Sequence, residues 1–391
     1  MTNCTLIDCT GKPAMKDMSI VIEGEKIAVL TPGVHQQADG EGRVGVFDLN
    51  GGFVLPGLWN CHAHPGDVFP HTPAAEHVMS TESPIARTIR AGRNAMDALR
   101  LGTTGIRVVG EPGFIDIAWK RAFDAGVFAG PRIFACGDAI GAGMVSGPYE
   151  MRKAVREQLK HGADQIKLMM PGLFLDEVKA ATEVAHQKGK RVCAHAGNPA
   201  IKTAIQGGVD CIEHGYFLDD EAIEMVVENG VFYVPTLVCA LDELFMRQSG
   251  WFDQFQKGRV VVARFESTRF EESHPVGFRK ALQAGVKIAY GGASNPIGEF
   301  TLLEIEHMVS WGMTEMEALI AATRTSADLC GLVDELGTVE VGKLADLIVL
   351  SADPLEDISN IRKLQMVFKG GNLVEIGESE GLLDFWELLL V

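Results

Sequence analysis

Eight short apolar runs alternate with amphipathic helical segments, and this alternation restricts the fold more than any other feature of the chain. The runs are FVLPGLWNCHAH (53–64), TTGIRVVG (103–110), RIFACGDA (132–139), DQIKLMM (164–170), RVCAHA (191–196), DCIEHG (210–215), VFYVPTL (231–237) and VKIAYGGAS (286–294). Nearly continuous apolar strands between helices are typical of a parallel sheet that is covered on both sides. Eight such units predict an α/β fold, a (β/α)8 TIM barrel.

The two ends of the chain have a different pattern. Residues 1–52 and 336–376 contain short β-like runs broken by Gly, Pro and Asp. We expect them to pair into a small β-sandwich domain beside a barrel of residues 53–335. The last barrel helix begins at a capping box formed by Thr314 and Glu317 and ends near Gly331. The tail, residues 377–391, fits neither unit and stays unassigned.

Charge and composition exclude several classes of function. The net charge of −17 argues against nucleic-acid or anionic-membrane partners, which require a basic surface. No apolar segment reaches the ~18 residues of a membrane span, and the N-terminus does not resemble a signal peptide. The eight cysteines form no C-x-x-C pair, which predicts buried, reduced thiols. A cytoplasmic protein is therefore expected.

Four histidines lie where three of the predicted strands end. His62 and His64 are two residues apart at the end of the first run, so their side chains share a face and could bind one metal ion. His195 and His214 end two further runs. Singly, each is more often a hydrogen-bonded core or loop histidine than a ligand. Together they are expected to converge, because the active sites of such barrels lie at the carboxyl ends of the strands.

The other histidines are predicted to lie outside this cluster. His71 and His77, near the first run, could line the pocket, but solvated loop residues are the favoured interpretation. Five more lie in loops or helices away from strand ends: His35, His161, His186, His274 and His307.

Lys167 is an unusual residue for its surroundings, because it interrupts the apolar run DQIKLMM. A buried lysine is costly unless it is paired or chemically altered. Two interpretations are open: an ion pair with a carboxylate, or reaction of the neutral amine with carbon dioxide to give a carbamate, an anionic ligand that can bridge two metals.

In these motifs the chain resembles the amidohydrolase superfamily, in its metal-dependent branch of imidazolonepropionase-like and prolidase-type (Xaa-Pro dipeptidase-like) enzymes. The resemblance is carried by GGFVLPGLWNCHAH, GADQIKLM, VCAHA, GVDCIEHGYFLDDEAI, YVPTL, MTEMEALIAATRTSADLCGL and GTVEVGKLADLIVLSADPLEDI, in this order. It implies a flanking β-sandwich and two divalent ions, with zinc predicted. One ion would be held by His62 and His64 and the other by His195 and His214, with carbamylated Lys167 between them.

By the same resemblance, metal-activated hydroxide cleaves an amide bond, either peptide-like or in an N-acyl amino acid, in a small-molecule substrate. Tyr216 could hydrogen-bond the substrate or only pack on the barrel rim. Arg107 could bind a substrate carboxylate, but a buried salt bridge is the favoured interpretation. The chain could also form a homo-oligomer.

One departure from the family pattern bears on catalysis. Relatives follow the eighth strand with Gly-Thr-Asp, whose Asp is a metal ligand and general base, whereas this chain has Ala293 at that position. The neighbouring Ser294 and Asn295 cannot replace a carboxylate base. We therefore expect an impaired hydrolase. The alternatives are a cyclic amidohydrolase or deaminase that uses the same site, and a catalytically silent, metal-containing binding protein.

Overall fold

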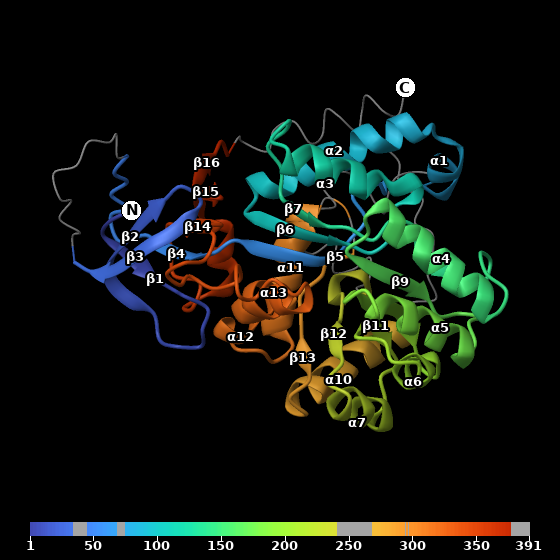
Figure 1. Cartoon of the computed structure of the whole chain (residues 1–391). Helices are drawn as coiled ribbons and strands as arrows, with labels where there is room; N and C mark the ends of the chain where they lie inside the picture. The colour runs from blue at the N-terminus through green and yellow to red at the C-terminus, as the bar shows by residue number, and fades with distance from the viewer. Residues whose placement is uncertain (34–44, 69–74, 241–267, 294, 296, 377–391) are drawn as a thin grey trace.

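The computed structural model describes residues 1–33, 45–68, 75–240, 268–293, 295 and 297–376. Figure 1 shows two parts: a sheet built from both ends of the chain, and a larger α/β body. The predicted tail at 377–391, together with His35, His71 and Ser294, lies outside the described residues.

The sheet of the first part has seven strands in the order β16-β15-β14-β4-β1-β2-β3. Its strands are β1 (Cys4–Leu6), β2 (Met15–Glu23), β3 (Lys26–Pro32), β4 (Phe53–Pro56), β14 (Leu347–Leu350), β15 (Leu364–Lys369) and β16 (Asn372–Val374). Blue and red strands therefore lie side by side in Figure 1. A separate apolar cluster, which includes Leu6, Ile20 and Phe368, stabilises this part.

β4 corrects one prediction. It pairs with β1 and β14, so the apolar run at 53–64 is not a single barrel strand. The chain turns at Pro56–Gly57, and the first barrel strand begins at Leu58. A Cβ on Gly57 would lie 2.1 Å from the Thr104 hydroxyl oxygen, so the close approach at this turn requires glycine. The domain limit at residue 335 stays a prediction.

The second part is the predicted (β/α)8 barrel. Each of the eight predicted apolar runs contributes a strand: β5 (Leu58–Ala63), β6 (Thr103–Val108), β7 (Arg132–Phe134), β9 (Gln165–Met169), β10 (Arg191–Gly197), β11 (Cys211–Tyr216), β12 (Phe232–Val234) and β13 (Lys287–Ile288). The third unit adds a short strand, β8 (Ile140–Gly141). Neighbouring barrel strands are parallel.

Backbone hydrogen bonds join the two barrel sheets to each other. The Asp164 N–H donates to the Ala135 carbonyl (2.8 Å) between β7 and β9, and the Cys61 N–H donates to the Tyr290 carbonyl (2.7 Å) between β5 and the residues after β13. These contacts close the ring of strands at both seams.

Helices cover the outside of the barrel (Figure 1). They are α1 (Ala75–Thr81), α2 (Pro84–Arg100), α3 (Ile115–Asp124), α4 (Pro148–His161), α5 (Leu175–His186), α6 (Ala200–Gln206), α7 (Asp220–Glu228), α10 (Thr268–Gln283), α11 (Ile297–Ser310), α12 (Glu315–Ile320) and α13 (Ser326–Leu329). Short helical turns are η1 (Pro112–Phe114), η2 (Leu237–Ala240), η3 (Ala321–Thr325) and η4 (Ile358–Arg362). The capping box of Thr314 and Glu317 is present at the start of α12, as predicted.

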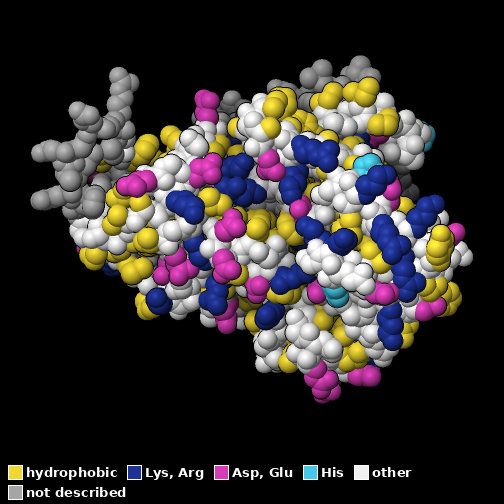
Figure 2. Space-filling view, viewed as in Figure 1, with side chains coloured by type: hydrophobic (Ala, Val, Ile, Leu, Met, Phe, Trp, Pro, Cys, Tyr) yellow, Lys and Arg dark blue, Asp and Glu magenta, His cyan; other side chains and the backbone are white. Residues whose placement is uncertain are grey.

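Surface and cysteine chemistry agree with the composition. Acidic and basic side chains are intermixed on the face shown in Figure 2. None of the helices in the described ranges has the length and apolar character needed to cross a membrane. Seven of the predicted thiols are free and buried: Cys4, Cys9, Cys61, Cys136, Cys193, Cys211 and Cys330.

Candidate active site

The four predicted histidines meet at the carboxyl ends of the barrel strands. His62 is in β5, His64 follows it directly, and His195 and His214 are in β10 and β11. Their rings form a continuous series: the centroids of His64 and His62 are 5.3 Å apart, those of His62 and His214 are 4.6 Å apart, and those of His214 and His195 are 4.5 Å apart. The structure thus brings the whole predicted set together.

Three of these imidazoles are fixed by a hydrogen bond at Nδ1. His62 Nδ1 lies 2.7 Å from Glu213 Oε2, His64 Nδ1 lies 2.9 Å from the Gly110 carbonyl, and His214 Nδ1 lies 2.7 Å from Thr236 Oγ1. A carbonyl or an ionised carboxylate can only accept, so Nδ1 of His62 and of His64 carries the proton. The Nε2 lone pairs of these two rings are then available to a ligand.

The environment keeps the rings of His62, His195 and His214 neutral. Burial lowers the pKa of His62 and His214 well below the ordinary value, and the nearby Lys167 lowers both further. Burial and Lys167 also lower the pKa of His195 to about 4. Near neutral pH, therefore, each of these three side chains is a neutral imidazole with a single ring proton, the form that coordinates metals.

Lys167 lies in β9, in register with Cys193 of β10, and is close enough to His62, His195 and His214 to lower the pKa of each. Its side chain is 1% exposed, and its Nζ has no hydrogen-bond partner among the described residues. Within the same residues it forms no ion pair, so the salt-bridge interpretation has no partner there. A buried, unpartnered amine is costly, so this atom is the strongest sign of an additional group.

Glu213 is a site residue that the sequence interpretation missed. One carboxylate oxygen accepts from His62, and the other lies 2.8 Å from Arg107 Nη1. Arg107 also donates to Gln165 Oε1 (2.6 Å) and to the Cys61 carbonyl (2.7 Å). Arg107 therefore forms the favoured buried salt bridge, and through Glu213 it orients His62.

The backbone of β11 explains why Glu213 and His214, although consecutive, both reach the site. His214 and Gly215 have φ of 66° and 64°, and the pairing with β10 shifts register beside them. A regular strand would turn two consecutive side chains to opposite faces. The left-handed residues break this alternation.

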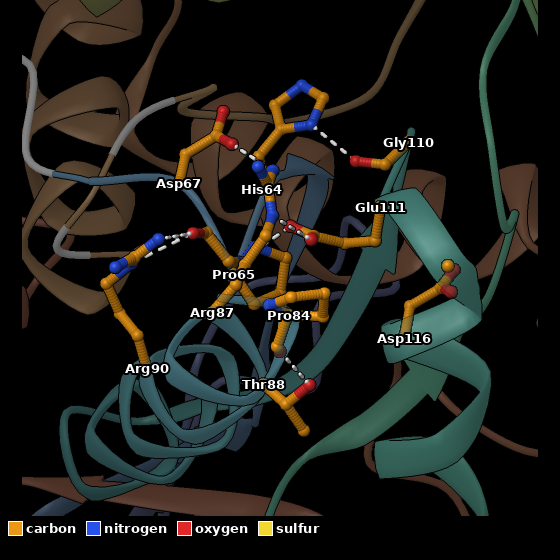
Figure 3. Close-up of polar contacts among 12 residues, drawn as sticks. His64, Pro65, Asp67, Pro84, Arg87, Thr88, Arg90, Gly110, Glu111 and Asp116 are labelled. Carbon is orange, nitrogen blue, oxygen red and sulfur yellow. Dashed lines mark hydrogen bonds and ion pairs between the residues drawn. The ribbon is translucent and has the colours of Figure 1, made fainter. Parts of the chain in front are cut away.

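The turn that carries His64 is held by buried side chains from several elements. The Glu111 carboxylate accepts from the Gly66 N–H (2.6 Å), and Arg90 donates through Nε and Nη2 to the Gly66 carbonyl (2.9 and 2.6 Å). Asn295 donates to the His64 carbonyl (2.8 Å). Figure 3 shows this turn between His64 and Glu111. Asn295 is thus a structural anchor in this position.

Ala293 lies beside His62, after β13. Its N–H donates to the His62 carbonyl (2.8 Å), and its φ is 55°, in the left-handed region that alanine rarely adopts. A Cβ on the preceding Gly291 would lie 2.6 Å from the His62 Cβ, so the end of β13 packs closely against β5. The position predicted for the base is at the site, but its methyl group can neither bind a metal nor move a proton.

Tyr216 and His274 form an aromatic wall next to the histidine cluster. The Tyr216 ring stacks on His214, with centroids 5.1 Å apart and planes 4° apart, and lies 5.2 Å from the ring of His274. His274 lies in a helix, α10, as predicted, but its side chain is buried and reaches Pro235 at the end of β12, contrary to the prediction that it lies away from strand ends. A role for Tyr216 in substrate binding stays a prediction.

The donor set fits a metal centre. As they stand, no three His, Cys, Asp or Glu side chains in the described part of the chain form a ready-made metal site. Neutral imidazoles with fixed Nδ1 atoms and an unpartnered lysine nevertheless match what two cations and a bridging carbamate require. The carbamate is a ligand that Lys167 would acquire by reaction.

Comparison with known proteins assigns the family. The amidohydrolase family matches residues 53–374. The chain belongs to the amidohydrolase family and is a hydrolase that acts on amide bonds. Members of this superfamily are typically metal-dependent. The predicted family resemblance is thus confirmed.

Three similar proteins show the range of the family. Ochratoxinase from Aspergillus niger is 30% identical over 373 residues, covering 82% of this chain and 75% of its own. Imidazolonepropionase from Porphyromonas gingivalis is 32% identical over 171 residues, covering 41% of this chain and 40% of its own. The crystal structure of a Xaa-Pro dipeptidase with bound methionine in the active site superposes with a TM-score of 0.83 at 33% identity, covering 95% of this chain and 98% of that one.

Proposed function

We propose that this protein is a binuclear metal-dependent amidohydrolase that cleaves a peptide-like or N-acyl amino acid bond in a small molecule. The observation that carries the proposal is the series of four neighbouring imidazoles together with the buried amine of Lys167, which has no hydrogen-bond partner among the described residues. Two relatives, ochratoxinase and a Xaa-Pro dipeptidase, have names that indicate amide substrates. These names support a linear amide as the bond that is cut.

His62 and His64 would hold one ion, and His195 and His214 the other, with zinc as the predicted metal. Lys167 would bridge them as a carbamate: its unprotonated Nζ forms a bond to the carbon of carbon dioxide, one proton leaves, and a carboxylate-like group results. The ions supply Lewis acidity and lower the pKa of bound water.

The other site residues have positioning or binding roles. Glu213, held by Arg107, orients His62, and the Gly110 carbonyl orients His64. Tyr216, next to His214, is placed to hydrogen-bond a substrate carbonyl or carboxylate. Ala293 provides no acceptor for the proton of the attacking water, so turnover is slow compared with a relative that has Asp at this position.

Ala293 also favours a second candidate, a catalytically silent, metal-containing binding protein. Hydrolysis of a cyclic amide, or deamination, would use the same residues. We further propose that the protein acts in the cytoplasm and forms a homo-oligomer.

Metal content and a lysine variant test the proposal. The protein purified with supplemented zinc should hold close to two equivalents by elemental analysis. Lys167→Ala should lose the paired site, and a short carboxylic acid should partly restore it by replacing the carbamate. Lys188→Ala, which removes an exposed lysine, is the matched control and should keep both ions.

The outcomes separate the candidates. Full zinc content in Lys167→Ala without added acid would refute the bridging role. A screen of dipeptides, N-acyl amino acids and cyclic amides with zinc-loaded protein then identifies the bond that is cut. Binding without any turnover at full metal content would establish the silent binding protein instead.

A further inference from the structure

The loop after β12 has a strained backbone at a buried position. Thr236 is 0% exposed, and its φ is 52°. A left-handed conformation is rare for a β-branched residue and is unfavourable, so the surrounding structure must impose it.

Two helices hold this loop in place. Both carboxylate oxygens of Glu304, in α11, accept backbone N–H groups, from Leu237 and Val238, each at 2.7 Å. His274 Nε2, in α10, donates to the Pro235 carbonyl at 2.7 Å. Glu304 is 0% exposed, so these bonds are shielded from water. The conformation of Thr236 is thus fixed from both sides.

The Thr236 hydroxyl then determines which nitrogen of His214 is protonated. A hydroxyl has one proton, and that of Thr236 is donated to the Pro235 carbonyl at 2.7 Å. Toward His214 Nδ1, also at 2.7 Å, the oxygen can only accept. With the hydroxyl proton directed to the Pro235 carbonyl, His214 carries its own proton on Nδ1, which leaves the lone pair on Nε2.

We propose that Thr236 and Glu304 are positioning residues that lock His214 in its Nδ1–H tautomer and so prepare Nε2 to coordinate a metal. The inference rests on the proposed function for its purpose, because the lock matters only if His214 is a ligand. Glu304 acts indirectly: it holds the loop that places the Thr236 hydroxyl.

The first experiment measures the tautomer without metal. Ring-nitrogen NMR of ¹⁵N-histidine-labelled, metal-free protein, assigned with His214→Gln, should show Nδ1 protonated and Nε2 unprotonated. Thr236→Val keeps the β-branch but removes the hydroxyl, so His214 should lose this single tautomer. Thr236→Ser keeps the hydroxyl and should retain it.

The second experiment measures zinc affinity by chelator competition. Loss of a partner behind a metal ligand typically weakens binding about 10- to 100-fold, which is the range expected for Thr236→Val. Glu304→Gln should also weaken zinc binding, because the new side-chain amide N–H₂ would face a backbone N–H and one of the two hydrogen bonds to the loop would be lost. Thr323→Val is the matched control, since it removes a buried hydroxyl that donates to the Leu319 carbonyl, away from His214.

Three results decide the proposal. Unchanged tautomer and zinc affinity in Thr236→Val would overturn it. Equal losses in Thr323→Val would show a general stability effect and would also overturn it. If the unmodified protein bound no zinc, the proposed function would be wrong. The NMR spectra of the metal-free protein would still show whether Thr236 fixes the tautomer of His214. Should Thr236→Val not fold, Thr236→Ala gives the same readouts.

Discussion

The buried pair of Glu213 and Arg107 allows a quantitative test of how the site is supported. Their side chains are 0% and 1% exposed, and Arg107 Nη1 lies 2.8 Å from Glu213 Oε1. Burial alone would raise the pKa of Glu213, but Arg107 and Lys167 hold it well below its usual range. The pair is therefore fully charged at pH 7, and Glu213→Gln removes one charge with little change in shape.

Glu213→Gln leaves the buried guanidinium of Arg107 without its carboxylate partner, and this determines the expected loss of stability. Removing one partner of a buried ion pair typically costs about 3–5 kcal/mol, against a total stability of about 5–15 kcal/mol. Arg107→Met should cost a similar amount, because it strands the carboxylate. The double variant leaves neither charge unpaired, so it should cost less than either single variant and far less than their sum of about 6–10 kcal/mol.

Urea unfolding of metal-free protein at pH 7, followed by circular dichroism and fluorescence, measures these free energies. Glu183→Gln is the control, since Glu183 pairs with Arg152 at the surface and should change stability by no more than about 0.5 kcal/mol. A cost below about 1 kcal/mol for Glu213→Gln, or single effects that simply add, would refute the argument.

Three further changes have defined outcomes. Ala293→Asp should raise kcat by about 10²- to 10⁴-fold and change KM little, with Ala293→Gly as a control for backbone strain; equal kcat values would place the base elsewhere. Lys167→Met replaces a buried amine, without a hydrogen-bond partner among the described residues, by an apolar side chain, so it should stabilise the metal-free protein against urea while abolishing zinc uptake; a loss of stability would show that the interaction of Lys167 with Glu213 outweighs the cost of burying the amine. Burial lowers the pKa of His274 from 6.5 to about 4. Below pH 6.5 the unfolded chain therefore binds more protons at this residue than the folded protein does. The free energy of unfolding of the metal-free protein should for this reason be ~2 kcal/mol lower at pH 5 than at pH 7. Unfolding free energies measured across this range should fall less steeply in His274→Gln, and parallel curves would contradict this.

The barrel and its cluster of four histidines were predictable because both depend on local patterns. Apolar runs mark the strands, and a polar residue at the end of a run lies at the mouth of the barrel. The division of the first run into β4 and β5 was missed because its residues are almost all apolar. The Pro56–Gly57 pair inside the run was the available signal, since this dipeptide marks turns.

Glu213 could not be assigned by the same logic. Strand alternation places it opposite His214, and only the left-handed backbone of His214 and Gly215 turns both side chains into the barrel. Thr236 and Glu304 are harder still. Glu304 lies within a helix and acts through backbone contacts 66 and 67 residues earlier in the chain, so no periodic pattern marks it.

The left-handed alanine at 293 separates the proposed base position from the proposed metal-ligand positions. Its N–H still bonds the His62 carbonyl, and Gly291 still packs against His62, so the backbone that places a base is intact without the carboxylate. Asp tolerates this φ better than Ala does, because its short polar side chain can hydrogen-bond locally. Ala293→Asp should therefore introduce an acceptor without remodelling β5 or displacing His62. The imidazoles of His62, His64 and His214 are held through Glu213, the Gly110 carbonyl and Thr236, none of which involves Ala293, so metal binding and proton transfer should respond to different substitutions.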